Sequence, residues 1–94
     1  MSGFPPAWKS FYDRALDYIN ERDLKEARWS AERSLYYVEK LVEPPARAKL
    51  QVFMVLQEIA TLQGDEGAAA NYAFQVRRFD GQRSLWQHIR DAQR

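Results

Sequence analysis

The stretch that decides the fold is Leu62-Gln63-Gly64-Asp65-Glu66-Gly67-Ala68-Ala69, a break between two helical patterns. A weaker copy lies 42 residues upstream, at residues 20–27, with Asp23 in the position of Asp65. The same shift superimposes two pairs of alanines, Ala27 on Ala69 and Ala31 on Ala73. We therefore predict two copies of one unit, each made of a helix, a tight turn whose Asp caps the next helix, and a second helix.

The composition is typical of one small packed domain. The 94 residues are 46% hydrophobic and 14% aromatic, which is too apolar for a disordered chain. Lys and Arg number 14 against 13 Asp and Glu, so the net charge of +1 gives no general attraction to nucleic acid or anionic lipid. The absence of cysteine excludes disulfides and thiolate metal sites. Neither a signal peptide nor a membrane-spanning run is recognisable, so we expect a cytoplasmic protein with no membrane partner.

The first unit is predicted over residues 7–42. Pro5 and Pro6 favour a helix that begins near residue 7 and ends near residue 21. Its apolar positions recur at intervals of three and four and form one stripe: Trp8, Phe11, Tyr12, Ala15, Tyr18 and Ile19. Asp23 with Glu26 three residues later reads as a capping box, so we expect a second helix over residues 24–42.

The second unit is predicted over residues 46–80, after the stop at Glu43-Pro44-Pro45. Its first helix, at residues 46–63, is apolar around much of its circumference, which predicts a place in the middle of the bundle. Gly64 should adopt a left-handed conformation, and the helix capped by Asp65 should end at Asp80-Gly81. A short terminal helix at about 82–93 would follow. The sequence thus predicts an all-α domain of about five helices, stacked as antiparallel hairpins.

The predicted unit resembles the tetratricopeptide repeat. It has a Gly-Asp turn between two helices, small residues at the helix contact and a Pro near its end. The second unit matches best, through Leu56, Gly64, Asp65, Ala69 and Ala73. The first unit keeps Ala15, Tyr18, Asp23, Ala27 and Ala31. Three positions depart from the pattern: Arg22 replaces Gly, Ser34 replaces Ala, and Gln57 replaces a small residue. The alternative is another small helical bundle, because any array of antiparallel hairpins gives similar spacings.

The resemblance implies a concave surface, lined by the first helix of each unit, that binds a segment of another protein. This surface would expose Lys9, Tyr12, Leu16 and Ile19 beside Gln51, Met54, Glu58 and Thr61. Family members that grip a C-terminal carboxylate use Lys and Asn where this chain has Tyr12 and Leu16. The resemblance therefore implies a groove for an apolar or amphipathic helix, in a protein-binding module or scaffold. The alternative is that these residues face another helix of the same core.

Several large aromatic residues fall outside the expected core stripes: Trp29, Tyr36, Tyr37 and Trp86. Repeat arrays generally need about three units or dedicated caps, because each unit leaves an apolar face for its neighbour. Either the terminal helix closes the stack, or an exposed end pairs with another protein or with a second copy as a homodimer. Trp and Tyr suit such an interface, and the alternative is that they pack in the core.

We expect no enzyme, cofactor or metal site. Ser84, His88 and Asp91 lie on one short helix, where they cannot reach one another and a shared substrate pocket. Glu58 is a carboxylate on an apolar helix, but no metal-binding spacing or phosphate-binding loop accompanies it.

Nucleic-acid binding is the alternative function. The C-terminal region is rich in cations, namely Arg77, Arg78, Arg83 and Arg90, and Phe79 and Trp86 are interleaved for stacking. Against this reading, cations near a helix C-terminus are ordinary partners of the helix dipole.

Overall fold

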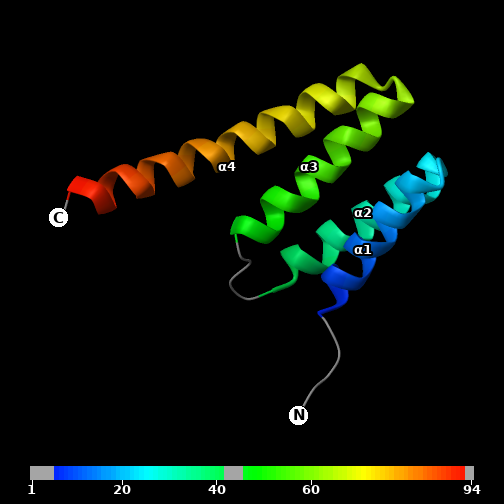
Figure 1. Ribbon diagram of the computed structural model, residues 1–94, viewed down its shortest axis with the longest axis horizontal. Helices are drawn as coiled ribbons and strands as arrows, with labels where there is room; N and C mark the ends of the chain where they lie inside the picture. The colour runs from blue at the N-terminus through cyan, green and yellow to red at the C-terminus, as the bar shows by residue number, and fades with distance from the viewer. Residues whose placement is uncertain (1–5, 42–45, 93–94) are drawn as a thin grey trace, which may run out of the picture.

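The structure is a computed structural model that describes residues 6–41 and 46–92, with the side chains of the last helix described as far as Phe79. Within these ranges the chain forms four helices and no strand (Figure 1). The helices are α1 (Ala7–Asn20), α2 (Leu24–Glu39), α3 (Ala46–Gln63) and α4 (Glu66–Ala92). The all-α class predicted from the sequence is confirmed.

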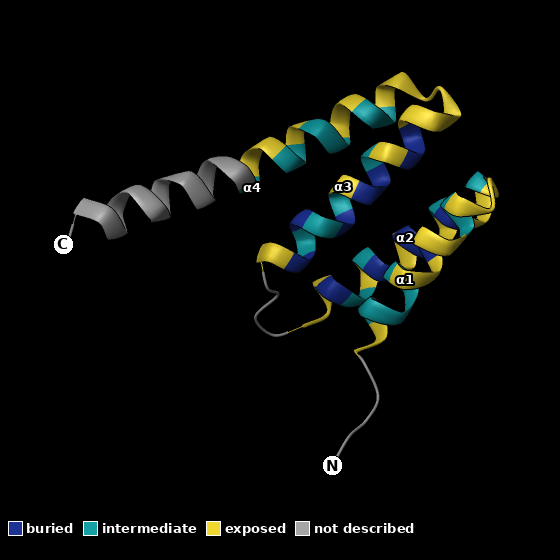
Figure 2. Cartoon of the chain, viewed as in Figure 1, coloured by how far each residue is buried: buried dark blue, intermediate teal, exposed yellow. Residues whose placement is uncertain are grey.

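The helices form two antiparallel hairpins, α1 with α2 and α3 with α4, and the hairpins pack through α2 and α3 (Figure 1). α1 also touches α3, and these two helices run in the same direction. α3 therefore contacts all three other helices, which confirms its predicted central place. Its buried residues follow its length (Figure 2): Ala48, Leu50, Val52, Val55, Leu56, Ile59 and Ala60. Among the residues that the structure describes, α4 packs on α3 alone.

The two hairpin turns share one backbone geometry. In each turn, the N–H of the aspartate donates to the carbonyl oxygen five residues earlier, and the N–H of the preceding residue donates to the carbonyl oxygen three residues earlier, at 2.9 to 3.1 Å. This pair of hydrogen bonds is the Schellman motif, which requires a left-handed residue after the helix. That residue is Arg22 at φ 64° in the first turn and Gly64 at φ 76° in the second. The 42-residue repeat of the sequence is thus a repeat of structure at the turns.

Each aspartate also caps the helix that follows. Asp23 Oδ1 accepts a hydrogen bond from the Glu26 N–H at 3.3 Å, and Asp65 Oδ1 accepts one from the Ala68 N–H at 3.2 Å. Both caps predicted from the sequence are confirmed. In a complete capping box, the Glu26 side chain would also accept a hydrogen bond from the Asp23 N–H. Here that N–H donates instead to the carbonyl oxygen of Tyr18.

Small residues bring α1 and α2 close together. Ala15 of α1 lies in one core cluster with Ala27 and Ala31 of α2, and none of the three is more than 1% exposed. Ser34 is fully buried in the same interface, where its hydroxyl donates to the carbonyl oxygen of Trp8 at 2.7 Å. The serine therefore fills a position sized for a small side chain and adds a hydrogen bond between the helices.

Two predicted helix ends are wrong. α2 ends at Glu39 rather than near residue 42, and the proline stop at residues 42–45 lies outside the described residues. α4 continues without a break through Asp80-Gly81 to Ala92, so the separate helix predicted at 82–93 is instead the end of α4. Glycine inside a helix costs about 1 kcal/mol relative to alanine, but it keeps its N–H and does not force a break as proline does.

Candidate functional site

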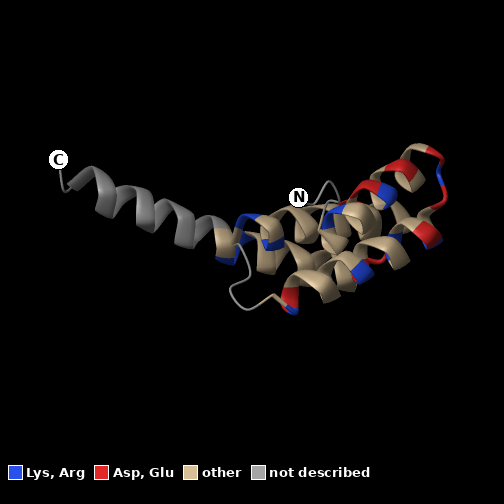
Figure 3. Ribbon diagram, turned by 90° about the horizontal axis from the view of Figure 1, so that it is seen from below, with Lys and Arg blue, Asp and Glu red and all other residues tan. Residues whose placement is uncertain are grey.

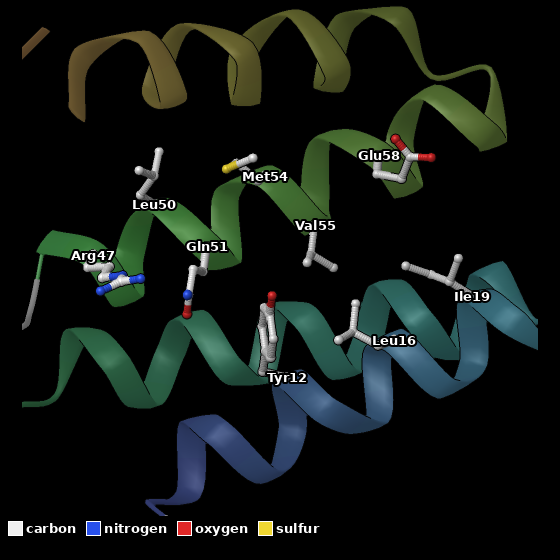
Figure 4. Close-up of a pocket in the computed structure, with 9 residues that line it drawn as sticks. All are labelled: Tyr12, Leu16, Ile19, Arg47, Leu50, Gln51, Met54, Val55 and Glu58. Atoms are coloured by element: carbon white, nitrogen blue, oxygen red, sulfur yellow. The ribbon is translucent and has the colours of Figure 1, made fainter. Parts of the chain in front are cut away.

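An open groove of about 510 Å³ lies between the two parallel helices α1 and α3 (Figure 4). α1 contributes Tyr12, Leu16 and Ile19, and α3 contributes Arg47, Leu50, Gln51, Met54, Val55 and Glu58. Figure 4 shows Tyr12 and Leu16 pointing from α1 towards α3, with Gln51 and Val55 pointing back. The lining is mostly apolar, and its charged and amide groups, on Arg47, Gln51 and Glu58, all come from α3.

Helical spacing explains why these side chains meet. The three residues of α1 follow one another at intervals of four and three, so they lie along one side of that helix. Arg47, Gln51, Met54 and Glu58 repeat at intervals of four, three and four on α3. Because α1 and α3 run in the same direction, the two rows lie alongside each other over about two helical turns.

The groove has an apolar middle and opposite charges at its ends. Arg47 and Glu58 are both exposed and stand eleven residues apart on α3, which is about 16 Å along the helix axis. Between them, Met54 is 53% exposed and Leu16 is 38% exposed, large fractions for apolar side chains. Such an arrangement can hold the apolar side of a second helix and orient it by a charge at each end.

Five of the residues predicted to bind a partner line this groove: Tyr12, Leu16, Ile19, Met54 and Glu58. Lys9 and Thr61, which the resemblance also placed on the surface, are not among its lining residues; the Lys9 ammonium pairs with Asp13 at 3.1 Å. Arg47 was not predicted from the sequence as a site residue, although it begins the same row as Gln51. Leu50 and Val55 were expected only as part of an apolar helix, and both are buried here at the groove floor.

The predicted residues Trp29 and Tyr36 lie elsewhere, on the exposed side of α2. Each is 48% exposed, and neither lines the groove. Phe11 of α1 stacks on Tyr37 with ring centroids 5.5 Å apart and planes 10° apart. Trp29 makes a T-shaped contact with Phe11, with ring centroids 6.0 Å apart, and Tyr36 makes one with Tyr37, with centroids 5.3 Å apart. The four rings therefore form one chain across α1 and α2, with its two ends open to solvent.

Three cations lie over these rings. The Arg33 guanidinium is 5.2 Å from the centroid of Trp29, the Lys40 ammonium is 5.0 Å from Tyr36, and Arg14 is 5.7 Å from Phe11. None of the three makes an ion pair with a residue that the structure describes. Rings and cations alternate along α2 as Trp29, Arg33, Tyr36 and Lys40, and we call this row the aromatic–cation stripe.

A cluster of ion pairs and hydrogen bonds joins the two hairpins near their turns, where acidic residues gather (Figure 3). The Arg28 guanidinium of α2 donates to Asp65 Oδ2 at 3.1 Å and to Gln63 Oε1 at 3.0 Å, and also reaches Glu32 at 3.2 Å. The Ala68 N–H and Arg28 lower the pKa of the Asp65 carboxyl below its usual value, and Asp65 raises the pKa of Arg28. This cluster fixes the second turn against α2.

The proposed nucleic-acid residues are only partly described. Arg77 and Arg78 are exposed on α4. The side chains of Arg83, Trp86 and Arg90, and those of Ser84, His88 and Asp91, lie outside the described residues. Phe79 stacks on Phe53 at 6.0 Å, so its ring is engaged within the α3–α4 hairpin.

Comparison of this chain with protein-family models, with curated proteins and with solved structures finds no match. In the parts of the chain that the structure describes, no helix is long and apolar enough to cross a membrane. The same parts hold no group of three His, Cys, Asp or Glu side chains placed to bind a metal ion.

Proposed function

We propose that this chain is a non-enzymatic protein–protein interaction module, similar in plan to a short tetratricopeptide array. It binds an amphipathic helix or peptide of another protein in the groove between α1 and α3. The observation that carries the proposal is an open apolar groove between the first helices of the two hairpins, lined by Tyr12, Leu16 and Met54, with Tyr12 and Leu16 pointing towards α3.

Two further features support this function. The hairpins repeat the same turn and cap, and parallel first helices provide a straight groove on one side of the stack. The groove is also bounded by Arg47 and Glu58, which would select a ligand with an acidic residue at one end and a basic residue at the other. A ligand of about three helical turns fills the distance between the two charges.

The test is the double variant Tyr12→Ala with Met54→Ala. The probe is a synthetic amphipathic helix with leucines at intervals of three and four, one Glu at one end and one Lys at the other. Burying a Met or Tyr side chain contributes about 1.5 to 3 kcal/mol, so the double variant should bind at least about tenfold more weakly. Affinity is measured by titrating the isotope-labelled protein and following its amide resonances.

Phe74→Ala is the matched control. Phe74 is 54% exposed, nearly the same fraction as Met54, but it lies on α4 and does not line the groove. The control should bind the probe as the unmodified chain does. If the double variant folds and retains its affinity, or if the resonances that shift lie outside α1 and α3, the groove assignment is wrong.

A further inference from the structure

We propose that the aromatic–cation stripe of α2 is a second docking surface, which binds an acidic amphipathic helix of another protein. The stripe consists of Trp29, Arg33, Tyr36 and Lys40, with Phe11, Arg14 and Tyr37 behind it. None of these residues lines the groove between α1 and α3, so this inference stands independently of the function proposed for that groove.

The first argument is preorganisation. Trp29 and Tyr36 are half exposed, yet each is held by an edge contact to the stacked pair of Phe11 and Tyr37. A partner that covers Trp29 and Tyr36 therefore gains the area of two large rings without ordering them from a mobile state. Trp, Tyr and Arg are also the side chains that most often dominate the binding energy of protein interfaces.

The second argument is charge. Arg14, Arg33 and Lys40 are held above rings and have no carboxylate partner among the described residues. A partner's carboxylates can therefore pair with these cations without breaking an existing ion pair. Each such pair would form beside an aromatic ring that shields it from water, which strengthens the attraction.

The third argument is spacing. Trp29 and Tyr36 are seven residues apart, and so are Arg33 and Lys40, which is about 10.5 Å along the helix in each case. A second helix repeats its side chains with the same period when two helices pack lengthwise. A partner helix with carboxylates seven residues apart, next to an apolar row, would meet both cations and both rings in one register.

The same details disfavour single-stranded nucleic acid as the occupant. Stacking of bases needs open ring faces, but Arg33 and Lys40 already lie over Trp29 and Tyr36. Glu26 and Glu39 are exposed one helical turn beyond the two ends of the ring pair, where they would repel a phosphate backbone. A helix can place a basic residue at those ends, whereas a polyanion cannot.

The experiment uses the full chain, labelled for NMR, and three probes at low salt. The first is a synthetic helix of about three heptads with Leu at one heptad position and Glu at a neighbouring one. The second is the same peptide with Lys in place of Glu, and the third is a short oligothymidylate strand. We expect the Glu peptide alone to shift amide resonances of residues 25–40, and to bind there more weakly as salt is added.

The variant Arg33→Glu with Lys40→Glu should weaken this binding by about tenfold or more, because two attractions become repulsions. Both side chains are exposed, so the fold should be retained. Arg33→Gln with Lys40→Gln removes the two charges without reversing them, so it should weaken binding of the Glu peptide less. Because it adds no charge, it also checks that the loss in the Glu variant does not come from misfolding. Arg78→Glu, a reversal at an exposed position of α4 that does not line the groove, should leave the affinity unchanged. Equal binding of the Lys peptide, binding of the oligothymidylate instead, resonance shifts centred on the groove, or no binding of the Glu peptide would each overturn the proposal.

Discussion

At the scale of single residues, the two turns offer an internal comparison. Arg22 and Gly64 adopt the same left-handed backbone at equivalent positions, φ 64° and 76°. A residue with a Cβ carries a steric penalty of about 1 to 2 kcal/mol in this conformation, whereas glycine carries none. The first turn therefore keeps its geometry through its hydrogen bonds and its Asp cap despite an unfavourable residue.

We expect Gly64→Ala to destabilise the protein by about 1 kcal/mol and Arg22→Gly to stabilise it by about 0.5 kcal/mol, after the greater flexibility of unfolded glycine is subtracted. A Cβ on Gly64 would meet no atom within 4 Å, so the effect comes from the backbone alone. Urea denaturation measures both changes.

Gly67→Ala is the control for this pair. Gly67 lies in the first turn of α4, and its Cβ would meet only Asp65 Oδ1, at 4.0 Å. Alanine is favoured over glycine inside a helix, so the same substitution three residues later should stabilise the protein by up to about 1 kcal/mol. If Gly64→Ala and Gly67→Ala change the free energy of unfolding in the same direction, the left-handed backbone at Gly64 does not determine the effect of alanine there.

A second residue-scale prediction concerns pH. The pKa of Asp65 is lowered in the folded protein by the Ala68 N–H and by Arg28. The stability that its charge contributes is therefore complete above the unfolded pKa of about 4 and is lost as the pH falls through the lower folded value. Asp65→Asn keeps a capping oxygen but removes the charge.

The unmodified chain should therefore be more stable than Asp65→Asn at neutral pH, and the two should converge in strong acid. Urea denaturation at pH 7 and near pH 2 measures the difference. Added salt should narrow the gap at pH 7, because the ion pair with Arg28 is partly exposed. A gap of equal size at both pH values would mean that the carboxylate charge contributes nothing to this turn.

At the scale of elements, α4 is where the sequence pattern and the structure differ most. Asp80-Gly81 has the same form as Gly64-Asp65 with the order reversed, and the sequence alone does not show whether the glycine ends a helix or continues one. A glycine ends a helix when it adopts the left-handed conformation and hydrogen bonds run back to the last carbonyl groups, as at Gly64. Without these features, the hydrogen bonds of the helix continue past the glycine, which is then an ordinary residue inside the helix.

Gly81→Ala distinguishes the two cases. In an unbroken α4 the change should raise stability or helicity, by about 0.5 to 1 kcal/mol, because alanine favours the helix. A left-handed glycine at the end of a helix would give the opposite sign, as expected for Gly64→Ala. Circular dichroism and thermal unfolding measure the effect. A destabilised variant would mean that α4 ends near Gly81 and that a separate helix follows at 82–93.

At the scale of the whole molecule, the sequence predicted what local chemistry determines. The starts of α1 and α3, both Asp caps and the left-handed Gly64 follow from short-range rules that proline, aspartate and glycine obey in any context. The end of α2 and the length of α4 were predicted wrongly, because frayed ends and interior glycines depend on what packs nearby.

The candidate site was predictable to a similar degree. The groove residues Tyr12, Leu16 and Met54 came from the expected pairing of two first helices, and the structure places them together. The ring–ring contacts that join α1 to α2 were not predicted, since Phe11 belongs to another helix than Trp29 and Tyr37. Contacts of this kind depend on the crossing of α1 and α2, which no periodicity within a single helix determines.

The stripe also bears on self-association. A two-fold dimer presents the same patch to its copy, so the mainly basic stripe would face another basic stripe. We therefore expect light scattering at low salt to give the mass of a monomer over a wide range of concentration. A partner helix with carboxylates would remove this repulsion, whereas a second copy would not. If a concentration-dependent dimer forms and Trp29→Ala with Tyr36→Ala abolishes it, the aromatic–cation stripe is a self-association surface, and the acidic-helix proposal is wrong.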